Sequence, residues 1–294
     1  MKIITEIDKM KTYARIIKKE NKLVGLVPTM GYLHEGHLSL IRMARKQCDT
    51  LIVSIFVNPI QFAPDEDFKK YPRDIKRDED LVKSCGVDAL FCPQNEDMYP
   101  ADFSTFVDVE KMTGSMEGAS RPGHFRGVTT VVMKLFEITK PDIAYFGQKD
   151  AQQAFVIRKM TQDLNMDVTT KVFPTVREES GLAMSSRNAY LTKSEKADAS
   201  VLYRSLKLAE DLIVSGEKDT KKIIKKVREI ISNVPSIKID YITIADTKSL
   251  KEVSALRGEI LIAIAVLVGK TRLIDNIMLD MEKLKGVYAA SKSQ

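Results

Sequence analysis

Strand-like and helix-like segments alternate over the first 176 residues, and this alternation restricts the fold more than any other feature of the chain. Residues 51–57 form a continuous apolar, β-branched run, which is typical of a parallel strand buried on both faces. Similar runs occupy residues 23–27, 87–91, 143–146 and 168–173, and helical patterns separate them at 75–85, 128–139 and 151–164. This order predicts a Rossmann-like α/β domain, a doubly wound parallel sheet with helices on both faces.

The order of elements changes near residue 176. Two helices come first, at 194–214 and 220–231, with Thr192 or Ser194 as the cap of the first. Strands follow at 237–244, 260–268 and 272–279, and the last two form a predicted hairpin. We therefore expect a first domain over residues 1–176 and a smaller C-terminal α+β domain over 177–294, with a frayed tail from Met281.

The bulk properties favour a soluble protein and exclude several classes of function. With 294 residues, of which 44% are hydrophobic and 29% charged, the chain can form two substantial cores. No apolar run reaches the roughly 18 residues of a membrane span, and acidic residues come too early for a signal peptide. Three Cys without close pairing favour a reducing, cytoplasmic location. A net charge of +6 without Trp or a dense basic patch does not indicate nucleic-acid binding.

The segment Pro28-Thr-Met-Gly-Tyr-Leu-His-Glu-Gly-His37 joins the strand-like run at 23–27 to a helical pattern that begins at Leu38. Free backbone N–H groups and the helix dipole attract phosphate at such a junction. Two imidazoles there can donate hydrogen bonds to a triphosphate without adding a fixed charge. The alternatives are ordinary turn glycines, surface histidines, or zinc ligands that include His124, although the Cys spacing offers no partner ligands.

Four predicted strands end in unusual polar loops, at residues 28–37, 58–62, 146–153 and 174–177, and residues 184–188 follow shortly after the last. In an open α/β sheet, ligands bind beyond the carboxyl ends of the strands. Because these loops share that edge of the sheet, the sequence predicts one common site.

The charged residues of these loops suit a nucleotide. Lys149 can bind phosphate and Asp150 can accept a ribose hydroxyl, although an exposed pair at a helix start is the simpler alternative. Ser185, Ser186 and Arg187 offer two hydroxyls and a guanidinium fork that could clamp phosphate, or they form a plain polar loop.

Three further side chains are candidates for substrate and metal. Gln61 and Gln153 donate and accept hydrogen bonds, so they suit a small substrate with hydroxyl and carboxylate groups, or they are surface glutamines. Asp78 could support Mg²⁺ beside phosphates, although a solvated helix face is the usual reading of its charged neighbours.

At this point the chain resembles the pantoate–β-alanine ligases of the nucleotidylyltransferase superfamily. The resemblance rests on the segment at 28–37 and on Asn58-Pro-Ile-Gln-Phe62, Tyr71-Pro-Arg73, Arg121-Pro-Gly-His-Phe-Arg-Gly-Val128, Phe146-Gly-Gln-Lys-Asp150 and Met184-Ser-Ser-Arg-Asn188. They occur in the family's order, and the similarity covers nearly the whole chain except its C-terminal tail. Tyr32 stands where the family often has alanine, and the lysine-rich C-terminal third is similar only loosely.

The resemblance implies an ATP-dependent condensation of (R)-pantoate with β-alanine, which yields (R)-pantothenate, AMP and diphosphate. The carboxylate of pantoate would attack the α-phosphorus of ATP, and the amine of β-alanine would then attack the pantoyl adenylate. The resemblance also implies Mg²⁺ and a homodimer whose partners are small molecules. The second domain would act as a lid that shields the adenylate from water.

The resemblance assigns residues to these steps. Catalytic roles would fall to His37, His34, Lys149 and Arg187, with His37 as the better proton donor to the leaving group. Gln61 would bind pantoate and β-alanine, Gln153 would bind pantoate, and Asp78 is the candidate for the metal. The ATP site would comprise Met30, Gly31, Tyr32, Leu33, His34, Glu35, Gly36, His37, Gly147, Gln148, Lys149, Asp150, Val176, Met184, Ser185, Ser186 and Arg187.

Two other functions stay open. A plain nucleotidylyltransferase would transfer AMP or CMP to a phosphate and would release diphosphate without forming an amide. A nucleotide-binding regulator would keep the fold without catalysis, but it has no need of so many hydrogen-bond donors around a leaving group.

Overall fold

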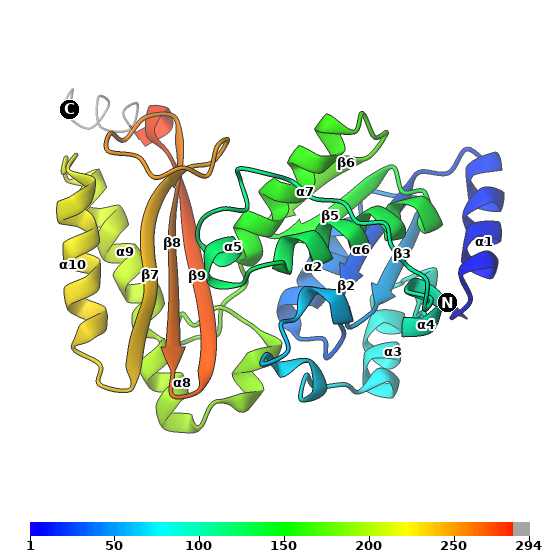
Figure 1. The fold of residues 1–294 in the computed structure, drawn as a ribbon, viewed down its shortest axis with the longest axis horizontal. Helices are drawn as coiled ribbons and strands as arrows, with labels where there is room; N and C mark the ends of the chain where they lie inside the picture. Colours follow the sequence, from blue (N-terminus) through cyan, green and yellow to red (C-terminus); the bar gives the residue numbers. More distant parts are fainter. Residues whose placement is uncertain (285–294) are drawn as a thin grey trace. The chain divides into compact units, whose positions relative to one another are not determined.

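The computed structural model describes residues 1–284, and the chain divides into two compact units, Met1–Val176 and Arg177–Gln294 (Figure 1). The predicted C-terminal tail begins with Met281 to Leu284, which are helical; the rest of it lies outside the described residues. No helix in the described part of the chain is long and apolar enough to span a membrane.

The first unit contains a six-stranded sheet with the order β1-β4-β3-β2-β5-β6, and all its strand pairs are parallel. The strands are β1 (Lys2–Ile4), β2 (Val24–Thr29), β3 (Thr50–Ile55), β4 (Ala89–Phe91), β5 (Ile143–Gly147) and β6 (Thr169–Phe173). From β2 the chain moves outward through β3 and β4, and it then crosses back to β5 on the other side of β2. The direction of winding therefore reverses between β2 and β5, which is where ligands bind in folds of this kind.

Helices cover both faces of this sheet (Figure 1). The longer helices are α1 (Ile7–Lys19), α2 (Glu35–Arg45), α3 (Ile75–Ser84), α6 (His124–Thr139) and α7 (Ala151–Asp163). The short ones are α4 (Asn95–Met98) and α5 (Glu117–Ser120), with the 3₁₀ turns η1 (Pro59–Gln61), η2 (Asp67–Lys69) and η3 (Gln148–Asp150). Ile41 of α2 and Val82 of α3 share one apolar cluster with Leu51 and Val53 of β3. Helices α1, α6 and α7 are neighbours on the opposite face. The predicted doubly wound α/β fold is confirmed.

The prediction omitted β1 and α1. Strand β1 has only three residues, of which two are exposed, so it shows no hydrophobic periodicity. Its edge position comes from pairing with β4, which lies more than eighty residues away in sequence. Helix α6 also begins four residues earlier than predicted, because Gly123 takes a left-handed conformation and turns the chain into the helix.

The second unit is an antiparallel sheet of three strands with the order β7-β8-β9, accompanied by helices, as predicted. The strands are β7 (Ile237–Asp246), β8 (Glu259–Val268) and β9 (Thr271–Asp280), and the helices are α8 (Lys193–Ala199), α9 (Val201–Val214) and α10 (Thr220–Ser232), with the 3₁₀ turn η4 (Ser186–Tyr190). The single helix expected at 194–214 is divided at Ser200, whose hydroxyl bonds the carbonyl of Ala197. Thr192 is the cap, in a reciprocal capping box with Glu195.

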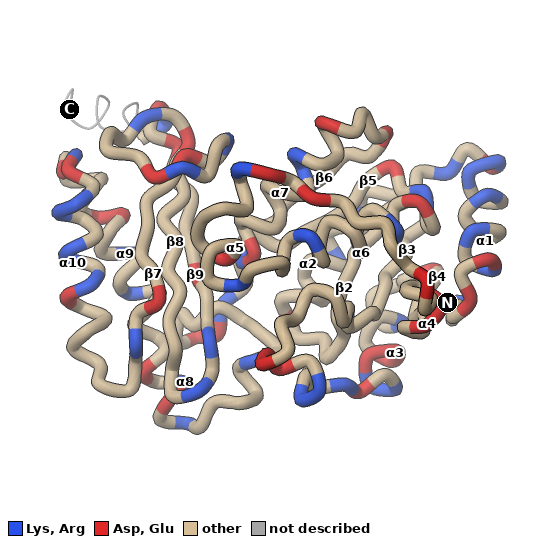
Figure 2. The backbone as a smooth tube through the Cα atoms, in the orientation of Figure 1, with Lys and Arg blue, Asp and Glu red and all other residues tan. Residues whose placement is uncertain are grey.

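Part of the positive charge of the second unit lies on α10, where Figure 2 shows basic residues along the helix. The buried side of α10 carries Ile223, Val227 and Ile231, spaced four residues apart. The lysines between them are exposed, so this part of the positive charge forms a solvated helix face.

Candidate active site

The loop between β2 and α2 turns through two consecutive residues with left-handed backbone, Gly31 (φ +82°) and Tyr32 (φ +51°). A Cβ at Gly31 would lie 2.9 Å from Ile55 Cγ2 and 3.1 Å from Asp78 Oδ2, so only glycine fits there. Tyr32 adopts a conformation that side chains rarely occupy, and it therefore needs support from its surroundings.

Helix α3 provides that support. The buried carboxylate of Asp78 accepts the backbone N–H of Tyr32 through Oδ2 at 2.6 Å and that of Leu33 through Oδ1 at 2.8 Å. Arg77 donates to the carbonyl of Leu33 at 2.9 Å, and its guanidinium lies 5.3 Å from the centre of the Tyr32 ring. Two charged neighbours on α3 thus fix the shape of the loop that leads to His34.

These contacts bear on the metal that the sequence assigned to Asp78. Burial raises the pKa of Asp78, and the two N–H groups and the Arg77 charge oppose that rise. Each oxygen is already occupied by a backbone donor, which does not favour direct coordination of Mg²⁺. Within residues 1–284, no group of three or more His, Cys, Asp and Glu side chains could hold a metal ion.

The rings of His34 and His37 lie against each other where α2 begins, with an angle of 34° between their planes. His34 is the extended N-cap residue, and its backbone N–H donates to Nδ1 of His37 at 3.3 Å. The ring centroids are 4.0 Å apart. Because Nδ1 of His37 accepts a hydrogen bond, a neutral His37 carries its proton on Nε2 and can donate through that nitrogen.

Both rings are neutral near pH 7. Burial, followed by the positive charge of Lys149, lowers the pKa of His34 to about 4. Burial, followed by His34 and then Lys149, lowers the pKa of His37 well below its ordinary value. Nδ1 of His34 is buried and makes no hydrogen bond within the described part of the chain, so it has unused capacity for a ligand.

The loop after β5 brings a positive charge to the histidines. Lys149 and Asp150 belong to η3, and Lys149 Nζ lies 3.6 Å from Asp150 Oδ1. Lys149 lowers the pKa of His34 and Asp150 raises it, which reflects their proximity to that ring. Since β2 and β5 are adjacent strands, the point where the winding reverses carries two neutral donors and one cation.

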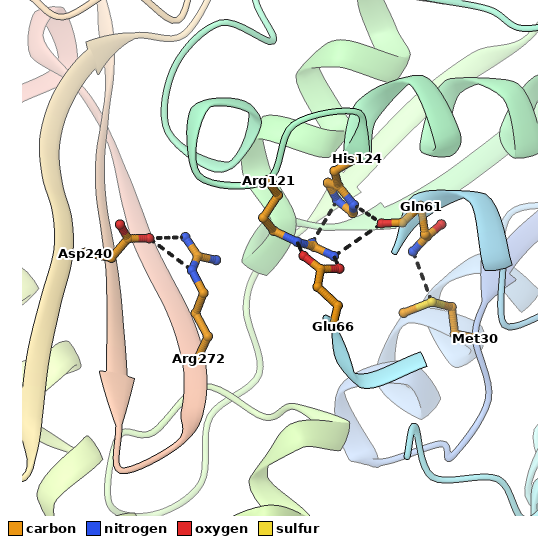
Figure 3. Close-up of polar contacts among 7 residues, drawn as sticks. All are labelled: Met30, Gln61, Glu66, Arg121, His124, Asp240 and Arg272. Carbon is orange, nitrogen blue, oxygen red and sulfur yellow. Dashed lines mark hydrogen bonds and ion pairs between the residues drawn. The ribbon is translucent and has the colours of Figure 1, made fainter. Parts of the chain in front are cut away.

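Gln61 lies at the end of η1 and is buried. Its Oε1 accepts from Asn58 Nδ2 at 3.0 Å, and its Nε2 contacts the sulfur of Met30 at 3.1 Å (Figure 3). The hydroxyl of Tyr99 donates to Asn58 Oδ1 at 2.8 Å, which fixes the orientation of the Asn58 amide. The amide NH₂ of Gln61 therefore has only the Met30 sulfur, a weak acceptor, as its hydrogen-bond partner among residues 1–284.

Two neighbouring glutamines of α7 have different environments. Gln152 is buried, and its amide bonds the backbone of Met112, Ser115 and Glu117. Gln153 is partly exposed on the first turn of the helix, directly after η3. Gln152 therefore has a structural role, while Gln153 is available to a ligand.

The serine–arginine segment belongs to the second unit, where Ser185 caps η4 by accepting the backbone N–H of Arg187 at 3.3 Å. Arg177 anchors the start of this region, since its guanidinium bonds the buried carboxylate of Asp275 at 2.6 and 3.0 Å. It also lies 4.0 Å from the centre of the Tyr203 ring. These contacts give the segment a defined shape.

The predicted residues therefore fall into two sets. The first unit gathers those on the loops after β2, β3 and β5, namely Met30, Gly31, Tyr32, Leu33, His34, Glu35, Gly36, His37, Gln61, Gly147, Gln148, Lys149, Asp150 and Gln153. Val176 ends the first unit, and the second unit contains Met184, Ser185, Ser186 and Arg187.

Three residues that the sequence did not assign to this site also support it. Tyr99 orients Asn58, as described above. Arg121 and His124 both bond the backbone carbonyl of Gln61. The spacing of Arg121 and His124 at a helix start was a usable signal, but their partner lies about sixty residues earlier in the chain.

Comparison with known proteins identifies relatives over nearly the whole length. A family model described as pantoate-beta-alanine ligase matches residues 2–278. Pantothenate synthetase of Carboxydothermus hydrogenoformans is 52% identical over 283 residues, which cover 96% of this chain and 100% of the relative. Pantothenate synthetase of Thermotoga neapolitana is 53% identical over 279 residues, 95% of this chain and 100% of the relative.

Solved structures give the same result. The crystal structure of pantothenate synthetase from Thermus thermophilus matches with a TM-score of 0.89 and 41% identity, over 96% of this chain and 99% of that chain. Pantoate-beta-alanine ligase from Francisella tularensis, complexed with beta-gamma ATP and beta-alanine, matches with a TM-score of 0.77 and 35% identity, over 96% and 98% of the two chains.

Proposed function

This chain belongs to the pantoate–β-alanine ligase family, and we propose that the site described above carries out that reaction. The protein is an AMP-forming ligase that uses ATP to join pantoate to β-alanine. The observation that carries the residue-level proposal is the pair of adjacent neutral histidines at the start of α2, close enough to Lys149 for its charge to lower their pKa values.

In the first step, a carboxylate oxygen of pantoate attacks the α-phosphorus of ATP, and the bond from that phosphorus to the bridging oxygen breaks. Negative charge develops on the departing diphosphate. In this proposal, the N-terminus of α2, the Nε2–H of His37 and the ammonium of Lys149 stabilise that charge. A neutral imidazole donates this hydrogen bond without adding a fixed positive charge to the site.

Gln61 and Gln153 hold the acid in this proposal. The Oε1 of Gln61 is engaged by Asn58, so its NH₂ group faces the ligand and donates to oxygen atoms of pantoate. The same group then serves the carboxylate of β-alanine. A neutral donor binds carboxylate without holding it so strongly that the nucleophile is quenched.

In the second step, the amine of β-alanine attacks the acyl carbon of pantoyl adenylate, AMP leaves with the bonding electron pair, and the nitrogen releases a proton to solvent. No enzyme nucleophile is required, because the acyl group is already activated on AMP. The chain has to position the amine and keep water away. We assign the second of these roles to the second unit as a lid, with Ser185, Ser186 and Arg187 on the phosphates.

Mg²⁺, the dimer and the cellular location rest on family membership. Since the contacts of Asp78 do not fit a direct ligand, Mg²⁺ is proposed to arrive as its complex with the phosphates of ATP, where it neutralises their charge. A cytoplasmic homodimer completes the proposal.

The test is pantoate-dependent exchange of labelled diphosphate into ATP without β-alanine, followed by AMP release when β-alanine is added. Exchange and stoichiometric AMP are expected for the wild type. In the His37→Ala variant, exchange should be about 10²–10³-fold slower, the range for loss of one such donor. Diphosphate release without AMP and amide would indicate a plain nucleotidylyltransferase, and binding of ATP without turnover would indicate a regulator.

A further inference from the structure

Arg121 connects three segments of the first unit. Its Nε and Nη2 each lie 2.6 Å from a carboxylate oxygen of Glu66, the residue that precedes η2. Its Nη1 lies 3.1 Å from Nε2 of His124 at the start of α6, and its Nη2 donates to the carbonyl of Gln61 in η1 at 3.4 Å (Figure 3). One guanidinium therefore joins η1, η2 and α6.

His124 completes this network. Its Nδ1 lies 2.9 Å from the carbonyl of Gln61, and because a carbonyl can only accept, Nδ1 must carry the proton. Nε2 is then the acceptor for Arg121. Burial, followed by the charge of Arg121, lowers the pKa of His124 to about 4, so this neutral tautomer persists at pH 7. The carbonyl of Gln61 thus receives two donors from the region that starts α6.

Glu66 is held as the charged partner. Burial alone would raise the pKa of this carboxyl, but the hydrogen bonds and the charge of Arg121 outweigh burial and bring the pKa below its ordinary value. The pair is mostly buried, with side chains 13% and 21% exposed. An ion pair with two parallel bonds and this degree of burial is far more directional than one on the surface.

We propose that Arg121 and His124 are positioning residues for the substrate-binding amide of Gln61, and that Glu66 holds Arg121 in place for this purpose. The inference rests on the function proposed for Gln61. The backbone of η1 is also restricted by close packing on α6. A Cβ at Gly127 would lie only 2.6 Å from Gln61 Cα, so the two backbones are in direct contact. With its carbonyl held on one side and its Oε1 held by Asn58, Gln61 presents its NH₂ group in one direction.

The first test replaces the guanidinium of Arg121 by an ammonium group, which removes the fork of donors but keeps the positive charge. Arg121→Lys cannot bond Glu66, His124 and the Gln61 carbonyl at once. The pantoate KM in ATP–diphosphate exchange should rise about tenfold or more, as expected for loss of charge-assisted hydrogen bonds, while the KM for ATP stays within about twofold. A purely structural role would change both constants together or lower the melting temperature alone.

The matched control is Arg272→Lys. Arg272 also forms an ion pair through Nε and Nη2, at 3.0 and 2.6 Å, but both nitrogens meet a single oxygen, Oδ2 of Asp240, in the second unit (Figure 3). This pair joins β9 to β7 within the second unit. Both KM values should remain close to those of the wild type, with any loss of stability similar to that of Arg121→Lys.

The second test uses His124 and remains decisive even if Arg121→Lys does not fold. Asparagine can place an amide N–H near the position of Nδ1 and keep the bond to the Gln61 carbonyl, whereas leucine cannot. His124→Leu should raise the pantoate KM about tenfold, and His124→Asn should recover most of that loss.

The inference is overturned if the pantoate KM is unchanged in Arg121→Lys and His124→Leu, if the KM for ATP rises equally, or if His124→Asn is no better than His124→Leu. A wild type without exchange would refute the proposed function itself. An active wild type with unaffected variants would refute only the role of Arg121 and His124.

Discussion

Each carboxylate oxygen of Asp78 accepts one backbone N–H from the loop that leads to His34 and His37. This is a role in shaping the site, since the loop contains Tyr32 in a left-handed conformation. The sequence placed Asp78 among solvated charges of a helix and named it as a metal candidate. Its burial and its two partners are properties of the folded chain only.

At this scale, Asp78→Asn should destabilise the loop and, with it, the arrangement of the proposed catalytic residues His34 and His37. Asparagine keeps one acceptor oxygen, but its NH₂ group then faces a backbone N–H, which is also a donor. The lost hydrogen bond should lower the free energy of unfolding by about 1–3 kcal/mol. We expect a lower melting temperature and slower exchange, with the Mg²⁺ concentration for half-maximal rate unchanged. The control is Asp74→Asn, an exposed residue at the start of the same helix, because asparagine caps a helix as well as aspartate does. A large increase in the Mg²⁺ requirement of Asp78→Asn would instead support metal binding.

At the scale of elements, the packing of η1 on α6 sets the position of the turn that carries Gln61, the proposed pantoate ligand. A Cβ at Gly127 would lie 2.4 Å from the carbonyl oxygen of Ile60, so no larger residue fits without moving η1. Asn58 Nδ2 also donates to the carbonyl of Gly127 at 3.0 Å. Helix α6 therefore holds η1 through close backbone contact as well as through Arg121 and His124.

Gly127→Ala should show this contact in solution. Alanine favours a helix interior over glycine by about 1 kcal/mol, but overpacking costs about 1–3 kcal/mol and should outweigh that gain. We expect a lower free energy of unfolding in urea and a higher pantoate KM. In the control, Gly114→Ala, the nearest atom to the new Cβ is Lys111 O at 3.7 Å, an ordinary contact. Stabilisation of Gly127→Ala would contradict the packing described here.

Taken over the whole molecule, all three histidines are held neutral by the fold. The pKa values of His34 and His124 are lowered to about 4, and that of His37 is lowered well below its ordinary value, in each case mainly by burial. In the unfolded chain these rings take up protons near pH 6.5. The unfolded state therefore binds more protons than the folded state between pH 6.5 and 4.

The free energy of unfolding should consequently fall as the pH is lowered from about 6.5 towards 4, and it should be greatest above pH 6.5. A pKa difference of one corresponds to about 1.4 kcal/mol, so His124 alone contributes roughly 3 kcal/mol across this range. Urea unfolding between pH 7 and about 5 isolates the histidines, because carboxyl groups of the unfolded chain remain mostly ionised there. His124→Asn should have a shallower slope than the wild type. A slope that is equal in both, or stability that rises on acidification, would contradict the prediction.

Patterns that are local in sequence determined much of this protein. The spacing of apolar residues predicted the parallel sheet, the antiparallel second unit and the edge on which the loops meet. It can do so because every second residue of a strand, and about every fourth residue of a helix, faces the same side. The motifs at 28–37, 58–62 and 146–150 specified the family. The C-terminal lid and the individual site residues remain predictions.

The tertiary structure alone decided how the site is held. Asp78 meets Tyr32 across 46 positions in the chain, and Arg121 meets Glu66 across 55. Edge strand β1 likewise exists only through its pairing with β4. The spacing of residues along the chain does not predict such contacts, because each one forms only after the sheet has brought together loops that are distant in sequence. The sequence therefore names the groups proposed to bind the substrate, and the fold supplies the groups that orient them.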